Sequence, residues 1–219
     1  WLEFAAAYAA FFITHSLPVR PPLRPMLQTA LGPRGFTLAY SALSLAALAW
    51  LIVAAGRAPF VPLWNWAPWQ LYVPLVAMLP VCLILALAIA RPNPFSFGGA
   101  LNAKFDPARP GIVRLHCHPL LLALALWATA HAVPNGDLAH LILFCTFAIF
   151  AILGTRLVDR RRQREMGDTW QKLRSEVART PLWPPSLTGD DALRLVAGLL
   201  LYATLIWLHP ALIGVSPLP

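Results

Sequence analysis

The sequence predicts an all-α, polytopic membrane protein, a bundle of six transmembrane helices, and two observations predict it. The first is composition: 58% of the 219 residues are hydrophobic and 12% are charged, whereas a soluble domain is about half apolar and about a quarter charged. The second is that charged residues are absent from five long stretches, residues 35–56, 58–90, 115–136, 138–155 and 195–219. Because a bilayer core of about 30 Å needs about 20 apolar residues in a helix, each stretch is expected to cross the membrane.

Residues 1–16 form the sixth expected span. The segment is apolar apart from Glu3, and it lacks the basic start and the small-residue cleavage site of a secretory signal peptide. We therefore expect it to be retained as a membrane anchor. With this helix included, residues 1–219 are expected to form a single integral membrane domain.

The basic residues predict the orientation of the spans. Sixteen of the 17 lie in the connections after the first, third and fifth spans or at the start of the last span, and only Arg57 lies on the other side. The positive-inside rule then places the basic loops in the cytoplasm and both termini outside, as in a protein of the bacterial inner membrane. Anionic lipid headgroups are sufficient partners for the net charge of +8, so we expect membrane lipids and no nucleic acid as partners.

A basic segment at residues 157–185 is expected to lie at the cytoplasmic surface. Within it, Met166, Trp170, Leu173 and Val177 recur at helical spacing among charged residues. Such a stripe predicts an amphipathic helix lying on the inner leaflet, and a solvated connector is the alternative. The proline-rich stretch at residues 181–185 ends this element in either case.

The histidines are the candidates for cofactor chemistry, because a buried ionisable group in a membrane needs a partner or a ligand. The predicted spans place His15 and His118 towards the inner side, and His131, His140 and His209 towards the outer side. At about 100° per residue, His116 and His118 point about 200° apart and cannot share one ion. His118 and His131 lie about 20 Å apart along one helix, so a site with two ligands needs a second helix.

Imidazole is a ligand for iron, copper and zinc, and a haem between helices needs small residues facing it. Ala125, Thr129 and Ala132 follow His118 at helical spacing and would leave such room. Close helix packing explains small residues equally well. By depth, His15 matches His118, and His131 matches His140.

Several motifs resemble a known family. They are ThrHisSer at 14–16, ProAsnProPheSerPheGlyGly at 92–99, ArgLeuHisCysHisPro at 114–119, AlaThrAlaHis at 128–131, ProAsnGlyAspLeuAlaHis at 134–140, AspArgArgArg at 159–162, GlyAspThrTrp at 167–170 and ThrProLeuTrpPro at 180–184. Together they resemble the NnrU family of membrane proteins, first noted in denitrification gene clusters. That family is also similar to plastid 15-cis-zeta-carotene isomerase, a membrane haem b enzyme.

The resemblance implies a membrane protein that binds haem b through His15 and a histidine of the fourth span. The motif favours His131 as the second iron ligand, whereas the depth argument favours His118, and both are kept. The implied function is isomerisation of a cis double bond in a lipophilic, carotenoid-like polyene, or a role in nitric oxide and denitrification metabolism. Cys117 stands where the family usually has arginine, which puts a contact to an anionic group at this position in doubt.

Two other classes of function are kept. The segment around His118 also resembles isoprenylcysteine carboxyl methyltransferases, in which case His118 with Arg156 or Arg160 would hold the carboxylate of S-adenosylmethionine. Asp159 and Glu165 match the acidic residues expected for that cofactor poorly. The third class is a non-enzymatic accessory protein of a respiratory complex.

Overall fold

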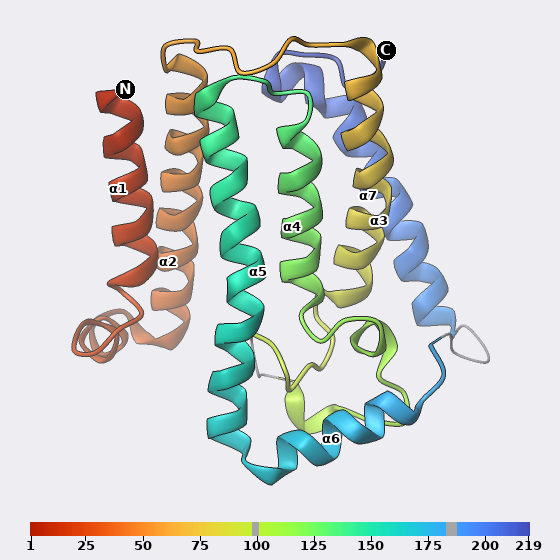
Figure 1. Ribbon diagram of the computed structural model, residues 1–219. Coiled ribbons are helices and arrows are strands. Elements are labelled where there is room, and N and C mark those ends of the chain that lie inside the picture. The colour runs from red at the N-terminus through yellow and green to blue at the C-terminus, as the bar shows by residue number, and fades with distance from the viewer. Residues whose placement is uncertain (98–100, 183–187) are drawn as a thin grey trace. The chain divides into compact units, whose positions relative to one another are not determined.

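The computed structural model describes residues 1–97, 101–182 and 188–219, and these residues form helices without any strand. The last residues of the 92–99 and 180–184 motifs and of the basic segment therefore lie outside the described residues. Within these described residues, seven α-helices follow one another (Figure 1): α1 (Leu2–Ser16), α2 (Leu23–Arg57), α3 (Tyr72–Ala88), α4 (Pro119–Ala132), α5 (Leu138–Met166), α6 (Asp168–Arg179) and α7 (Gly189–Ile213). The all-α class is confirmed.

Four of the described helices are long and apolar enough to cross a membrane. They are Leu23–Arg57, Pro68–Ala88, which joins a short 3-10 turn to α3, Leu138–Met166 and Gly189–Ile213. The chain therefore has the character of a membrane protein, but the count of six spans is not confirmed. α4 has 14 residues, which is about 21 Å of helix.

Proline explains why the predicted fourth span is shorter than its charge-free stretch. Pro119 occupies the first turn of α4, and proline disfavours helical backbone at the residue before it. His118 accordingly has φ −122° and ψ 66°, outside the helical region. Residues 115–118 are thus a loop, and the helix ends at Ala132, two residues before Pro134.

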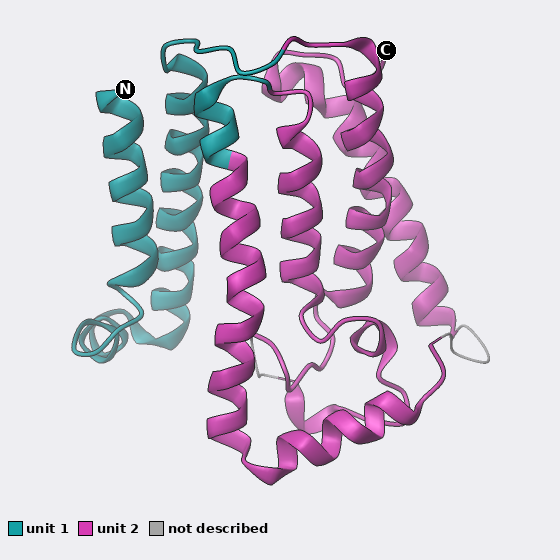
Figure 2. Ribbon diagram, viewed as in Figure 1, with its two compact units in different colours: residues 1–64, 136–143 teal, residues 65–135, 144–219 magenta. Residues whose placement is uncertain are grey.

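The chain divides into two compact units (Figure 2), residues 1–64 with 136–143 and residues 65–135 with 144–219. In unit 1, α1 packs on α2, and the Tyr40 hydroxyl donates a hydrogen bond to the backbone carbonyl of His15 at 3.2 Å. Gly136 must be glycine in this unit, because a Cβ there would lie 2.5 Å from the backbone oxygen of Trp64. The backbone amide of Leu138 then donates to the Val61 carbonyl at 2.9 Å.

In unit 2, α3 packs against both α4 and α7. Gly198 of α7 allows the close approach of α7 to α3, since a Cβ there would lie 3.1 Å from the Cα of Leu83. Small residues allow this kind of contact between membrane helices. Arg194 adds polar contacts at the end of α3 by donating to the carbonyls of Ala86 and Ile89, at 3.0 and 2.8 Å.

The predicted amphipathic helix is present as α6, although the basic residues 157–166 continue α5 instead of joining it. Its apolar stripe packs on protein. Trp170 and Val177 are buried with Phe95 and Val113, and Met166 and Leu173 pack against this cluster. The expected contact of the stripe with lipid is therefore replaced by a contact with the loop between α3 and α4.

Candidate functional site

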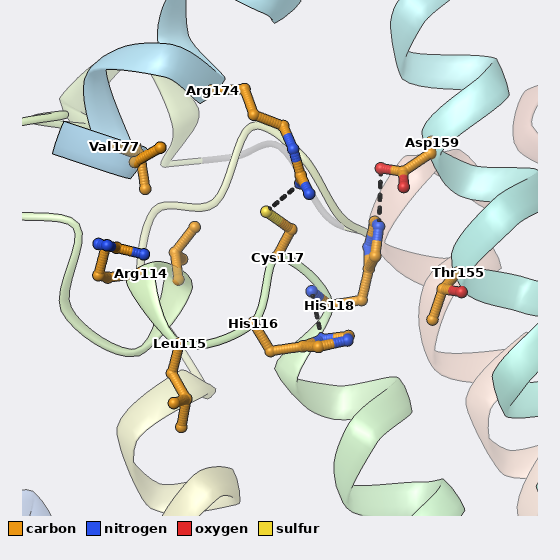
Figure 3. A pocket seen from close by; sticks show the side chains of 11 residues that line it. Arg114, Leu115, His116, Cys117, His118, Thr155, Asp159, Arg174 and Val177 are labelled. Atoms are coloured by element: carbon orange, nitrogen blue, oxygen red, sulfur yellow. Dashed lines mark hydrogen bonds and ion pairs between the residues drawn. The ribbon is translucent and has the colours of Figure 1, made fainter. Parts of the chain in front are cut away.

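A pocket of about 320 Å³ lies beside the start of α4, within unit 2 (Figure 3). Three parts of the chain line it: the loop at residues 113–118, Thr155 and Asp159 of α5, and Arg174, Val177 and Ala178 of α6. Thr155 and Asp159 are four residues apart and so share one face of α5. The docking of α6 by its apolar stripe holds Arg174 over the loop.

The buried polar group of the pocket is His118, which is 2% exposed. Its Nε2 donates to Oδ1 of Asp159 at 3.0 Å, and its Nδ1 has no hydrogen-bond partner among the described residues. Burial lowers the pKa of His118, while the hydrogen bond and the negative charge of Asp159 act in the opposite direction. The neutral imidazole is therefore the favoured form near neutral pH, with its lone pair on Nδ1.

Cys117, next to His118, faces α6. Arg174 donates from Nη1 to the Cys117 sulfur at 2.6 Å, and the Arg174 guanidinium lies 5.3 Å from the ring centroid of Trp170. Burial raises the pKa of the Cys117 thiol, and the charge of Arg174 opposes this shift. The thiol form is thus favoured. Cys117 stands where the family usually has arginine, but the Arg174 guanidinium from α6 lies beside this position.

His116 also lines the pocket, which corrects the expectation that its side chain and that of His118 point in opposite directions. The expectation assumed a helix, whereas residues 115–118 form a loop. The two ring centroids are 6.1 Å apart, and the His118 backbone amide donates to Nδ1 of His116 at 3.1 Å. Within residues 1–97, 101–182 and 188–219, no group of three or more histidine, cysteine or acidic residues is placed to hold a metal ion.

The lowered pKa of His118 makes stability depend on pH. Below about pH 6.5 the unfolded chain binds a proton at this histidine more readily than the folded chain does. The contribution of the neutral, buried His118 to the free energy of unfolding is fully present above that pH. It is lost as the pH falls through the lower pKa that His118 has in the folded state. We expect the melting temperature of the purified protein to fall between about pH 7.5 and about pH 5, and to fall less steeply in His118→Gln. Thermal unfolding at a series of pH values measures this, and equal slopes would contradict it.

His131 lies at the other end of α4, away from this pocket. Its Nδ1 donates to the Trp127 carbonyl at 2.8 Å, and its ring lies beside the rings of Trp127 and Phe144, at centroid distances of 5.4 and 5.7 Å. A carbonyl can only accept, so Nδ1 carries the proton and the lone pair of the neutral ring is on Nε2. His209 interacts electrostatically with His131 and likewise donates from Nδ1, to the Val215 carbonyl at 2.8 Å.

His15 lies in unit 1, near the end of α1. Its Nδ1 donates to the Phe11 carbonyl at 2.9 Å, and its ring is 4.0 Å from that of Phe11. The lone pair is again on Nε2. His140, expected to match His131 in depth, lies in unit 1 and donates from Nδ1 to Oδ2 of Asp137 at 2.7 Å.

The three predicted site histidines thus have different surroundings. His15 and His131 each keep Nε2 for a ligand, whereas Nε2 of His118 is held by Asp159. Sequence reasoning missed Arg174 and gave Asp159 no role, although the spacing of Thr155 and Asp159 on one face of α5 was visible. For the methyltransferase alternative, Asp159 already takes the nitrogen of His118 that would bind a carboxylate, and neither Arg156 nor Arg160 lines the pocket.

The four described helices that are long and apolar enough to cross a membrane give the chain the character of an α-helical membrane protein. Residues 3–217 match the family model described as NnrU protein, so the chain belongs to the NnrU family. No curated protein and no solved structure matches it.

Proposed function

We propose that this member of the NnrU family is an integral membrane protein that binds haem b. The observation that carries the proposal is the hydrogen bond from Nδ1 of His131 to the Trp127 carbonyl. Histidines that ligate metals commonly donate their other ring N–H to a carbonyl or a carboxylate, which fixes the tautomer and the ring orientation. His131 has this arrangement, with Nε2 as the nitrogen that would bind the iron.

His15 supports the proposal independently. Its Nδ1 donates to the carbonyl four residues earlier, as that of His131 does. The two histidines belong to different compact units. Each is proposed as an iron ligand because of its own hydrogen bond from Nδ1 to a backbone carbonyl. His118 fits the role poorly, because Asp159 holds its Nε2 and its Nδ1 is buried.

When bound, the haem would supply an iron centre for isomerising a cis double bond of a lipophilic polyene or for handling nitric oxide. The chain's own contribution is ligation and exclusion of water. The rings of Trp127 and Phe144 beside His131 provide an apolar surface for this. Following the distribution of basic residues, we also propose the bacterial inner membrane, with basic loops in the cytoplasm and both termini outside.

The absorption spectrum of the purified protein tests the proposal. With haem supplied during expression, we expect a Soret band that is lost or strongly reduced in His131→Ala and in His15→Ala. His118→Ala is the matched control, because it removes an imidazole from the same stretch of chain and should leave the band in place. A wild-type protein without a Soret band, or a band unchanged by both ligand substitutions, would overturn haem binding.

A further inference from the structure

The pocket beside the start of α4 is lined by two arginines, Arg114 and Arg174. We propose that it binds the phosphate of an anionic phospholipid headgroup, held by Arg114 and Arg174. The residues of this pocket do not include His15 or His131, so the proposal stands or fails separately from haem binding.

The position of the pocket along the helices favours a lipid. Thr155 is the last residue of the charge-free stretch of α5, and Asp159 lies one turn further on, among charged residues. The apolar helix α4 begins at Pro119, directly after His118. Both elements therefore change from apolar to polar at the pocket, and the headgroups of a bilayer lie at such a boundary.

The donors of the pocket fit a phosphate. Arg114 is fixed by a hydrogen bond from its Nε to the Thr180 carbonyl at 2.7 Å, and its two terminal nitrogens have no hydrogen-bond partner in the described part of the chain. Within the described residues, Arg174 donates a hydrogen bond from Nη1 alone, to the Cys117 sulfur, and its guanidinium face lies over the Trp170 ring. Guanidinium groups that are held in place bind phosphate through pairs of parallel hydrogen bonds.

The charge of the pocket also favours an anion. The only carboxylate among the lining residues is that of Asp159, and His118 already occupies one of its oxygens. Against this single negative charge stand the two guanidinium groups, with His116 as a further hydrogen-bonding group.

The size of the pocket and its apolar wall favour a lipid over free phosphate. About 320 Å³ equals roughly ten waters at about 30 Å³ each, which leaves room for the glycerol attached to the phosphate. Leu115, at the rim, is 59% exposed and offers an apolar contact for an acyl chain.

Native mass spectrometry of the full-length protein in detergent, titrated with phosphatidylglycerol, tests the proposal. Because Arg174→Gln and Arg114→Gln each remove charge-assisted hydrogen bonds to the phosphate, each should weaken binding about tenfold or more. Arg179→Gln is the matched control. It removes the same charge from an exposed position of α6 that does not line the pocket, and it should leave binding unchanged.

Two further arms identify the ligand. Phosphatidylcholine should bind much more weakly than phosphatidylglycerol, and inorganic phosphate alone should compete poorly. Saturating phosphatidylglycerol should also slow the alkylation of Cys117 by N-ethylmaleimide in the wild-type protein, a measurement that needs no variant to fold. Equal binding by wild type, Arg174→Gln and Arg114→Gln, or unprotected Cys117, would overturn the site. Inorganic phosphate binding as tightly as the lipid would overturn the lipid assignment.

Discussion

Trp170→Ala is expected to release α6 from the rest of unit 2. Trp170 is buried with Phe95 and Val113, and its ring meets that of Phe95 edge to face at 6.2 Å. Truncating a buried tryptophan costs about 3–5 kcal/mol, because apolar contacts are lost and a cavity remains. Since α6 has no other large buried side chain than Val177, we expect trypsin to cut at Lys172 and Arg174 much faster in the variant.

A second tryptophan provides the control for this prediction. Trp207 of α7 is 77% exposed, so Trp207→Ala removes the same atoms without creating a buried cavity, and cleavage within α6 should stay at the wild-type rate. Cys117 should become faster to alkylate only in Trp170→Ala, because Arg174 leaves its sulfur when α6 moves away. If α6 resists trypsin equally in both variants, its apolar stripe does not hold it in place.

The behaviour of α6 shows how far a periodic pattern predicts structure. The spacing of Met166, Trp170, Leu173 and Val177 predicted the helix, because it depends only on local geometry. The surface that this stripe contacts could not be predicted, since lipid and protein are both apolar. Phe95 and Val113, which cover it, lie more than 50 residues earlier in the sequence.

The spans were predictable to a similar extent. Charge-free stretches locate apolar segments, and the helices α2, α3, α5 and α7 fall within or across them. Helix length is less predictable, because proline shortens a helix without adding charge. Pro119 does so at residues 115–118, and this loop brings His116 and His118 to one pocket.

The candidate histidines were predictable by residue type, but their roles were not. Whether a ring nitrogen stays available as a ligand depends on its hydrogen-bond partner. The side-chain rotamers decide which partner that is. His131 and His15 both bond to a carbonyl on their own helix. His118 bonds to Asp159, 41 residues away, so its Nε2 is already engaged within the protein.

Asp159→Ala is expected to lower the free energy of unfolding by about 1–3 kcal/mol, because it leaves the buried imidazole of His118 with no hydrogen bond to either ring nitrogen. Nδ1 of His118 has no hydrogen-bond partner in the described part of the chain. The hydrogen bond from Nε2 to Asp159 is therefore the one that satisfies this buried side chain. Asp159→Asn keeps an acceptor oxygen and should cost less.

The double variant His118→Leu, Asp159→Ala removes both polar groups, and we expect its loss of stability to be smaller than the sum of the losses in His118→Leu and Asp159→Ala. Chemical unfolding in detergent micelles measures the wild type, the single variants Asp159→Ala, Asp159→Asn and His118→Leu, and the double variant. Additive losses in His118→Leu and Asp159→Ala would mean that the hydrogen bond between His118 and Asp159 contributes no coupling energy.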